Sequence, residues 1–158
     1  MMENNKDQLS NILSKLSDKD SYQKMMGAAQ LTEMDHIPLS TLPFLIEAFQ
    51  DDDIFVKRWC AIAFGKMGLE ATAAVPYLIE ALETLAPKSD KLSTDNTFFA
   101  IETCVSALGK IGTDEAVPIL IKLLYHNRRS IRMAAAKALN RIGTEDATSA
   151  LRDFSEPW

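Results

Sequence analysis

One phrase of sequence returns along this chain, and it limits the possible fold more than any other feature. Residues 56–68 read VKRWCAIAFGKMG, and residues 131–143 read IRMAAAKALNRIG, with a similar order of branched, small and basic side chains. A third copy stands at 104–112 (CVSALGKIG) and a weaker fourth at 27–34 (GAAQLTEM). Apolar residues three and four apart within a copy are typical of an amphipathic helix. Several copies of one helix predict a repeat architecture.

A second element repeats between these copies and begins with proline each time. Its segments are PFLIEAF from Pro43, PYLIEAL from Pro76 and PILIKLL from Pro118. Proline suits the first turn of a helix because an N–H at that position has no intrahelical partner to lose. Glycine ends the preceding helix because it accepts the left-handed backbone of the C-terminal cap. These closing glycines are Gly68, Gly112 and Gly143.

The spacing of the prolines locates one insertion. Pro43 and Pro76 lie 33 residues apart, whereas Pro76 and Pro118 lie 42 apart. The excess falls on residues 86–96, a polar stretch with turn-forming residues and no apolar periodicity. This composition predicts a mobile surface loop.

The periodicity predicts an all-α fold, an α/α superhelix (solenoid) of about four helical pairs preceded by one helix. The single helix is expected at about 5–16. The pairs are expected at about 20–34 with 40–50, 53–67 with 73–85, 97–111 with 114–125, and 128–142 with 145–154. We expect residues 1–158 to form a single domain, with repeats at about 20–50, 53–85, 97–125 and 128–154.

Composition limits where the protein works. With 158 residues, of which 47% are hydrophobic, the chain can bury the core of one domain. No apolar run approaches the roughly 20 residues that cross a bilayer. The first residues lack the basic-then-apolar order of a signal peptide. We therefore expect a cytoplasmic protein without a membrane partner.

The cysteines and histidines predict no redox or metal chemistry. Cys60 and Cys104 occupy the same position in successive copies of the first helix. Equivalent helices in a stack lie about 8–10 Å apart, farther than a disulfide spans. Both cysteines are therefore expected to be reduced, buried packing residues. His36 and His126 have no second ligand at metal-binding spacing, so we expect no metal and no cofactor.

Charge is distributed unevenly along the chain. The formal net charge is −5, yet residues 110–141 hold seven basic and two acidic side chains, a local charge of +5. An acidic protein is a poor general ligand for nucleic acid. The basic segment 110–141 nevertheless leaves nucleic-acid binding open as a lesser alternative, with an affinity that would fall steeply with salt.

The repeated phrases resemble the short HEAT-like repeats of phycobilisome (bilin) lyases. Their pattern is Val-Arg-x-x-Ala-Ala-x-Ala-Leu-Gly-x-Ile-Gly, then a loop, then Val-Pro-x-Leu-Ile-x-Ala-Leu. Residues 56–68 with 75–82 match it nearly throughout, as do residues 131–143, while the third copy has Ile101 where the basic residue belongs. The resemblance covers about residues 20–154 and implies an α/α superhelix. It also implies one candidate role, a bilin lyase-like subunit or a phycobiliprotein chaperone that holds an open-chain tetrapyrrole or its apoprotein.

No group of residues indicates catalysis. The chain has no Gly-rich phosphate loop, no Gly-x-Ser-x-Gly elbow and no His-Glu-x-x-His motif. We expect no catalytic residue and no enzymatic activity of this chain alone.

The second helices carry the predicted contact surface, because we expect them to form the inner, concave face of the solenoid. Placing Leu78 and Leu82 in the core leaves Tyr77 and Glu80 exposed. Aromatic side chains beside charged ones suit an interface, although the aromatic residues would also suit packing between second helices. The predicted partner-binding residues are Phe44, Glu47, Asp51, Tyr77, Glu80, Ile119, Lys122, Tyr125, Arg128 and Arg129.

Together these features predict a non-enzymatic scaffold or interaction module that binds a protein partner on its concave face. The alternatives are the bilin lyase-like or phycobiliprotein-binding role and, with less support, nucleic-acid binding through residues 110–141.

Overall fold

The computed structural model describes residues 2–86 and 94–154, with side chains from residue 7 onward. Every regular element in these ranges is helical, which confirms the predicted all-α fold. The α-helices are α1 (Met2–Leu16), α2 (Ser21–Glu33), α3 (Leu42–Phe49), α4 (Ile54–Met67), α5 (Val75–Leu85), α6 (Asp95–Ile111), α7 (Val117–Leu123), α8 (Arg129–Ile142) and α9 (Glu145–Asp153). Short 3-10 helices precede α3, α5 and α7, namely η1 (Leu39–Thr41), η2 (Gly68–Ala74) and η4 (Asp114–Ala116).

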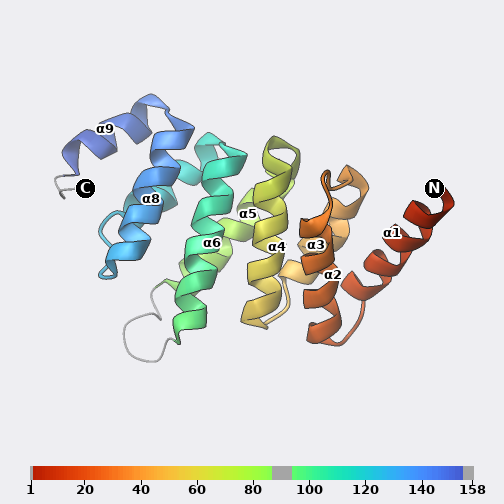
Figure 1. The fold of residues 1–158 in the computed structure, drawn as a ribbon. Coiled ribbons are helices and arrows are strands. Elements are labelled where there is room, and N and C mark those ends of the chain that lie inside the picture. Colours follow the sequence, from red (N-terminus) through yellow and green to blue (C-terminus); the bar gives the residue numbers. More distant parts are fainter. Residues whose placement is uncertain (1, 87–93, 155–158) are drawn as a thin grey trace.

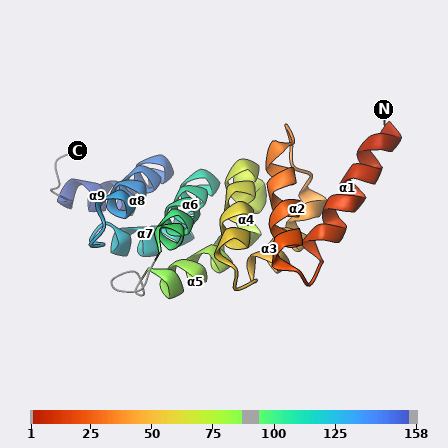
Figure 2. The same cartoon turned by 60° about the horizontal axis from the view of Figure 1, so that its bottom comes forward.

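The helices form two layers. Figure 1 shows α2, α4, α6 and α8 side by side in front, with α3, α5 and α7 behind them. In this first layer α2 packs on α4, α4 on α6, and α6 on α8. Helix α1 packs against α2 and α3, and Figure 2 shows it tilted relative to α2 at one end of the row. The arrangement is the α/α solenoid that the repeated phrases predict.

Local sequence explains where the helices begin. Proline occupies the first turn of α3, α5 and α7, where it costs no hydrogen bond. Side-chain caps begin other helices, because a short oxygen-bearing side chain satisfies a free N–H of the first turn. Asp20 accepts from the Tyr22 amide, Asp53 from those of Phe55 and Val56, and Thr144 from that of Ala147.

The three predicted glycines all end first-layer helices, but their backbones differ. Gly112 (φ 79°, ψ 30°) and Gly143 (φ 71°, ψ 15°) are left-handed, as expected. Gly68 also has a positive φ of 60°, but its ψ of −133° lies outside the left-handed helical region. Asparagine tolerates the left-handed region, whereas the Gly68 conformation is accessible essentially to glycine alone.

This difference predicts unequal responses to one substitution. Gly68→Asn should lower the free energy of unfolding by about 1–3 kcal/mol because the new residue must adopt a strained backbone. Gly112→Asn should lower the free energy of unfolding by less than half of the loss caused by Gly68→Asn. A Cβ at Gly112 would meet no atom within 4 Å, and at Gly68 the nearest atom would be 3.8 Å away, so crowding affects neither variant. Urea unfolding measures both, and equal losses would contradict the conformational explanation.

The predicted insertion lies mostly outside the described residues, which leave out 87–93. The predicted C-terminal boundary of the insertion, residue 96, is wrong by two residues, because α6 begins at Asp95. Thr94 has the extended backbone of an N-terminal cap, and the acidic Asp95 suits the positive end of the helix dipole. Two residues assigned to the loop therefore belong to the first turn of α6.

Small residues bring the first-layer helices close together. A Cβ placed on Gly109 of α6 would lie 2.7 Å from the Cα of Ala138 in α8. A Cβ on Gly65 of α4 would lie 3.3 Å from the Cα of Ala107 in α6. Real Cβ atoms essentially never approach other atoms as closely as 2.7 Å, so glycine permits the approach of α6 to α8.

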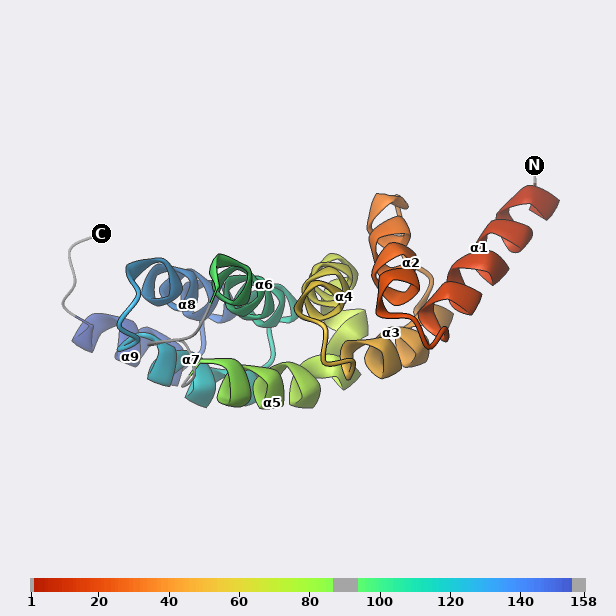
Figure 3. The same ribbon diagram turned by 90° about the horizontal axis from the view of Figure 1, so that it is seen from below.

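The stack is curved, with the first layer on the inner side. Figure 3 shows α9, α7, α5 and α3 along the outer side of a shallow arc. Second-layer helices make few contacts with one another, whereas those of the first layer pack closely, and a stack bends toward its more closely packed layer. The expectation that the second helices form the concave face is therefore wrong. That face belongs to α2, α4, α6 and α8.

Candidate functional site

The ten predicted contact residues do not form one continuous exposed surface. Those on α3, α5 and α7 belong to the second layer, on the outer side of the curve. Ile119 is only 6% exposed, so packing rather than contact explains its apolar side chain. Phe44 and Tyr77 are half-buried against the core. The remaining exposed members are Glu47, Glu80, Lys122, Tyr125, Arg128 and Arg129.

Tyr77 and Glu80 do border a hollow, at the junction of α5 with the loop between α3 and α4. This outer hollow has a volume of about 280 Å³ and is also lined by Phe49, Asp52 and Lys57. The Lys57 amine donates to the carbonyl of Phe49 at 2.9 Å, so part of the polar lining is already used within the chain.

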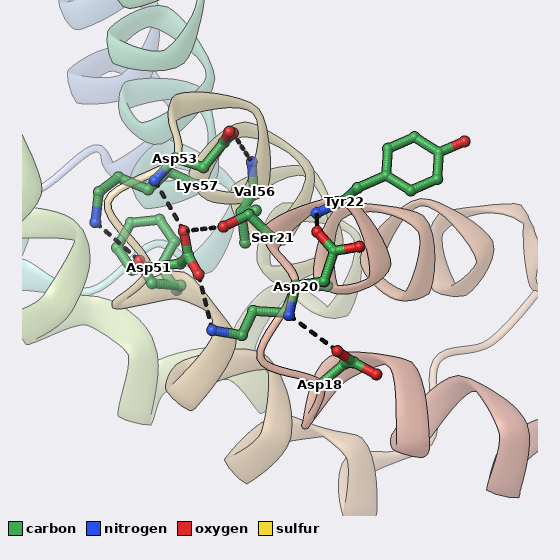
Figure 4. Close-up of polar contacts among 10 residues, drawn as sticks. Asp18, Asp20, Ser21, Tyr22, Asp51, Asp53, Val56 and Lys57 are labelled. Atoms are coloured by element: carbon green, nitrogen blue, oxygen red, sulfur yellow. Dashed lines mark hydrogen bonds and ion pairs between the residues drawn. The ribbon is translucent and has the colours of Figure 1, made fainter.

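The Asp51 carboxylate accepts hydrogen bonds from three groups of the chain itself. It accepts from the Lys24 amine at 2.7 Å, from the Ser21 hydroxyl at 2.9 Å and from the Asp53 amide at 2.9 Å. Figure 4 shows the Asp51 carboxylate between Ser21 of α2 and the start of α4. Burial alone would raise the pKa of Asp51, but these hydrogen bonds outweigh burial and hold the pKa below its ordinary value. Asp51 therefore joins two repeats.

The lowered pKa gives a pH-dependent prediction. A carboxylate with a depressed folded-state pKa stabilises the fold above its unfolded pKa, and the contribution disappears as pH falls through the folded value. Asp51→Asn should therefore lower the unfolding free energy at pH 7 by about 1.5–3 kcal/mol, the range for hydrogen bonds to charged groups. The difference from the parent protein should shrink below about pH 4.

The neighbouring Asp52→Asn is the matched control, since Asp52 is exposed. It should change the unfolding free energy by less than about 0.5 kcal/mol. Thermal or urea unfolding between pH 3 and pH 7 measures both variants. A pH-independent loss in Asp51→Asn would show that its charge is not what stabilises the junction.

Arg128 and Tyr125 also contact the chain itself. The Arg128 guanidinium lies 3.7 Å from the centre of the Phe98 ring and 3.4 Å from the Asp95 carboxylate. The Tyr125 ring meets Phe154 edge to face, with centroids 5.9 Å apart. These residues join the loop after α7 to α6 and to the end of α9.

The first layer holds a groove that the sequence prediction missed. One hollow of about 210 Å³ lies between α4 and α6, and a second of about 500 Å³ lies between α6 and α8. Glu102, Ser106 and Lys110 of α6 line both. We call the two hollows together the inner groove. Its other exposed or half-buried lining residues are Arg58, Ile62, Phe99, Thr103, Ser130, Met133, Ala134, Lys137 and Arg141.

A signal for this groove exists in the repeated phrase. Corresponding buried positions keep similar residues, such as Val56 and Ile131 or Phe64 and Leu139. Two other positions change chemistry from copy to copy, reading Arg58 and Ile62, then Glu102 and Ser106, then Met133 and Lys137, while a third position stays basic as Lys66, Lys110 and Arg141. Positions that change within a repeating phrase are free of the packing constraint, and these face the inner side of the stack.

The groove is positively charged at one end. Lys110, Lys137 and Arg141 are exposed and make no hydrogen bond or ion pair within the described ranges. Glu102 is the acidic residue among the lining side chains. Arg58 lies over the ring of Phe99 at 5.6 Å, which places a cation and an aromatic edge at the α4 side. Charged and apolar groups side by side can hold a peptide.

Cys60 and Cys104 are free and fully buried, which confirms the predicted packing role. Burial raises the pKa of both thiols, that of Cys104 to about 12. Because the thiolate is the reactive form, both should react slowly with a thiol reagent at neutral pH and fully in denaturant. Rapid labelling of both in the native protein would contradict this burial. The matched measurement in denaturant confirms that two thiols are available.

Two other features bear on function. Among residues 2–86 and 94–154, no three His, Cys, Asp or Glu side chains are arranged to hold a metal ion. No helix in the same part of the chain combines the length and apolar character that a bilayer crossing requires.

Known proteins share both the repeats and the fold. The family model for HEAT repeats matches residues 100–157, and that for the PBS lyase HEAT-like repeat matches residues 56–84. The chain is 32% identical over 114 residues to phycocyanobilin lyase subunit alpha of Nostoc sp. (strain PCC 7120); the match covers 72% of this chain and 40% of that relative. The crystal structure of an engineered protein from the Northeast Structural Genomics Consortium aligns with a TM-score of 0.61 at 21% identity, covering 93% of this chain and 68% of that one.

Proposed function

Because this chain belongs to the HEAT-like repeat family, we propose that it is a non-enzymatic interaction module that binds a partner protein in the inner groove. The observation that carries the proposal is the groove itself, lined by exposed side chains from three consecutive first-layer helices. Large concave surfaces of repeat proteins serve as extended binding faces.

The outer hollow at Tyr77 and Glu80 is the competing face. It supports partner binding less well because it is smaller and its Lys57 amine is already bound within the chain. Asp51 and Arg128 make internal contacts, and Ile119 is buried. The exposed charges of Glu47, Glu80 and Lys122 remain available to a partner that approaches from the outer side.

A lyase-like role is the second candidate, supported by the 32% identity to the phycocyanobilin lyase subunit. The chain spans two-fifths of that relative's length, so the activity of the whole relative does not transfer directly. An open-chain tetrapyrrole bound by this chain would change its visible absorption spectrum on binding. Titration of phycocyanobilin with the protein therefore separates this role from binding of a protein alone.

Site-specific photocrosslinking tests which face meets the partner. A photoreactive amino acid at Ser106, an exposed residue shared by both hollows of the inner groove, should form adducts with a partner in an extract of the source organism. The same group at Glu80 should not, and a third copy at the exposed Ser14 of α1 gives the background. Adducts from Glu80 without adducts from Ser106 would move the binding face to the outer side.

A further inference from the structure

Three exposed aromatic residues occupy the same repeat position on the first layer. Tyr22, Phe55 and Phe99 each stand five residues before the buried Gly27, Cys60 or Cys104 of their own helix. Their exposed fractions are 59%, 39% and 50%. We call them the aromatic row. Single exposed apolar residues are ordinary on a protein surface, but a row at one repeated position of a concave face indicates a contact surface.

A basic row runs beside the aromatic row. Lys66, Lys110 and Arg141 share a second repeat position, in the last turns of α4, α6 and α8, and Lys137 lies one turn earlier on α8. The Lys66 amine already donates to the carbonyls of Thr32 (3.0 Å) and Met34. Lys110, Lys137 and Arg141 therefore supply the free positive charge, and all three line the inner groove.

The distance between the rows suits one kind of secondary structure. Phe55 and Lys66, like Phe99 and Lys110, are separated by eleven positions, which is about 16 Å along a helix and close to three full turns. Both rows consequently face the same side. An α-helix with its side chains is about 10–12 Å wide, so it fits between the rows with one flank on each.

The distance between neighbouring first-layer helices also matches an α-helix lying across them. Neighbouring packed helices lie about 8–10 Å apart, and seven residues of an α-helix rise about 10.5 Å while returning to nearly the same face. A partner helix laid across the first layer would therefore present equivalent residues to successive repeats every seven positions. An extended strand has a period of two and gives no comparable match.

We infer that the occupant of the inner groove is an acidic amphipathic α-helix that crosses α4, α6 and α8, with apolar residues on Phe55 and Phe99 and carboxylates on Lys110, Lys137 and Arg141. The inference rests on the proposed function and names the partner's chemistry. In a chain of net charge −5, three unpaired cations at one end of a groove select an acidic ligand.

The helix dipole does not account for the basic row and the aromatic row together. Lys66, Lys110 and Arg141 stand in last turns, where positive charge favours the helix dipole. That effect leaves Lys137 and the aromatic row unexplained. Single-stranded nucleic acid also binds cations beside aromatic rings, so an oligonucleotide is the competitor in the test below.

A designed peptide pair tests the inference. Each peptide has about 21 residues in three sevens, with leucines forming one stripe and the adjoining flank made entirely of Glu or entirely of Lys. Fluorescence anisotropy at low salt should give at least about tenfold tighter binding, or 1.4 kcal/mol, for the Glu peptide. A Glu peptide of identical composition but scrambled period should bind no better than the Lys peptide.

Variants of the protein place the interaction in the groove. The triple variant Lys110→Glu, Lys137→Glu, Arg141→Glu should reverse the preference and bind the Lys peptide more tightly, with the helical circular-dichroism spectrum of the parent protein. Phe55→Ser with Phe99→Ser should weaken the Glu peptide about tenfold. The outer-layer control Lys122→Glu should change nothing. A structural role of the basic row in the helix dipole would not produce the reversal.

Several outcomes would overturn the inference. These are equal binding of the Glu and Lys peptides, equal binding of the scrambled peptide, or displacement of the Glu peptide from the basic row by a single-stranded oligonucleotide at lower concentration than by unlabelled peptide. If Ser106 crosslinks to a partner while no peptide preference appears, the groove binds a protein of different chemistry. If the Ser106 adduct is also absent, the proposed function fails with it.

Discussion

The close approach of α4, α6 and α8 is the contact on which the rest of the structure depends. Gly109 allows Ala138 to approach to a distance that a side chain at position 109 would not permit, and Gly65 makes a tight but less restrictive contact with Ala107 one helix earlier. Because only the first layer is drawn together like this, the stack bends toward it. The same small residues leave the floor of the inner groove low while longer side chains form its walls.

Local signals made the fold predictable, and their absence explains what was missed. Proline at the start of α3, α5 and α7 and glycine at the end of α4, α6 and α8 act within a few residues, so the helices could be placed from sequence. The direction of curvature depends on distances between helices, which no single segment encodes. The concave face was therefore assigned to the wrong layer, and the binding residues were sought there.

Polar residues in the loops were harder still to interpret. Asp51 has the appearance of a free surface charge in an Asp-Asp-Asp run, yet Lys24 and Ser21 reach it from a helix almost thirty residues away. Arg128 likewise contacts Phe98 and Asp95 at the start of α6. In both cases the partner comes from the preceding repeat, so only the stacked structure shows that the charge is satisfied.

Lys66 links the first two repeats at the C-terminal end of α2. Helix α2 has no glycine at its C-terminal end, where Met34 adopts an extended conformation and its amide donates to the Leu31 carbonyl. The other carbonyls at a helix end need partners from outside the helix. The Lys66 amine from the following repeat supplies them, donating to the carbonyls of Thr32 and Met34. In repeat proteins each repeat is stabilised by contacts with the adjacent repeats. Here the first repeat, whose sequence differs most from the others, has the C-terminal end of its first helix capped by a side chain of the second repeat. We therefore expect the stability of the C-terminal end of α2 to depend on the presence of α4.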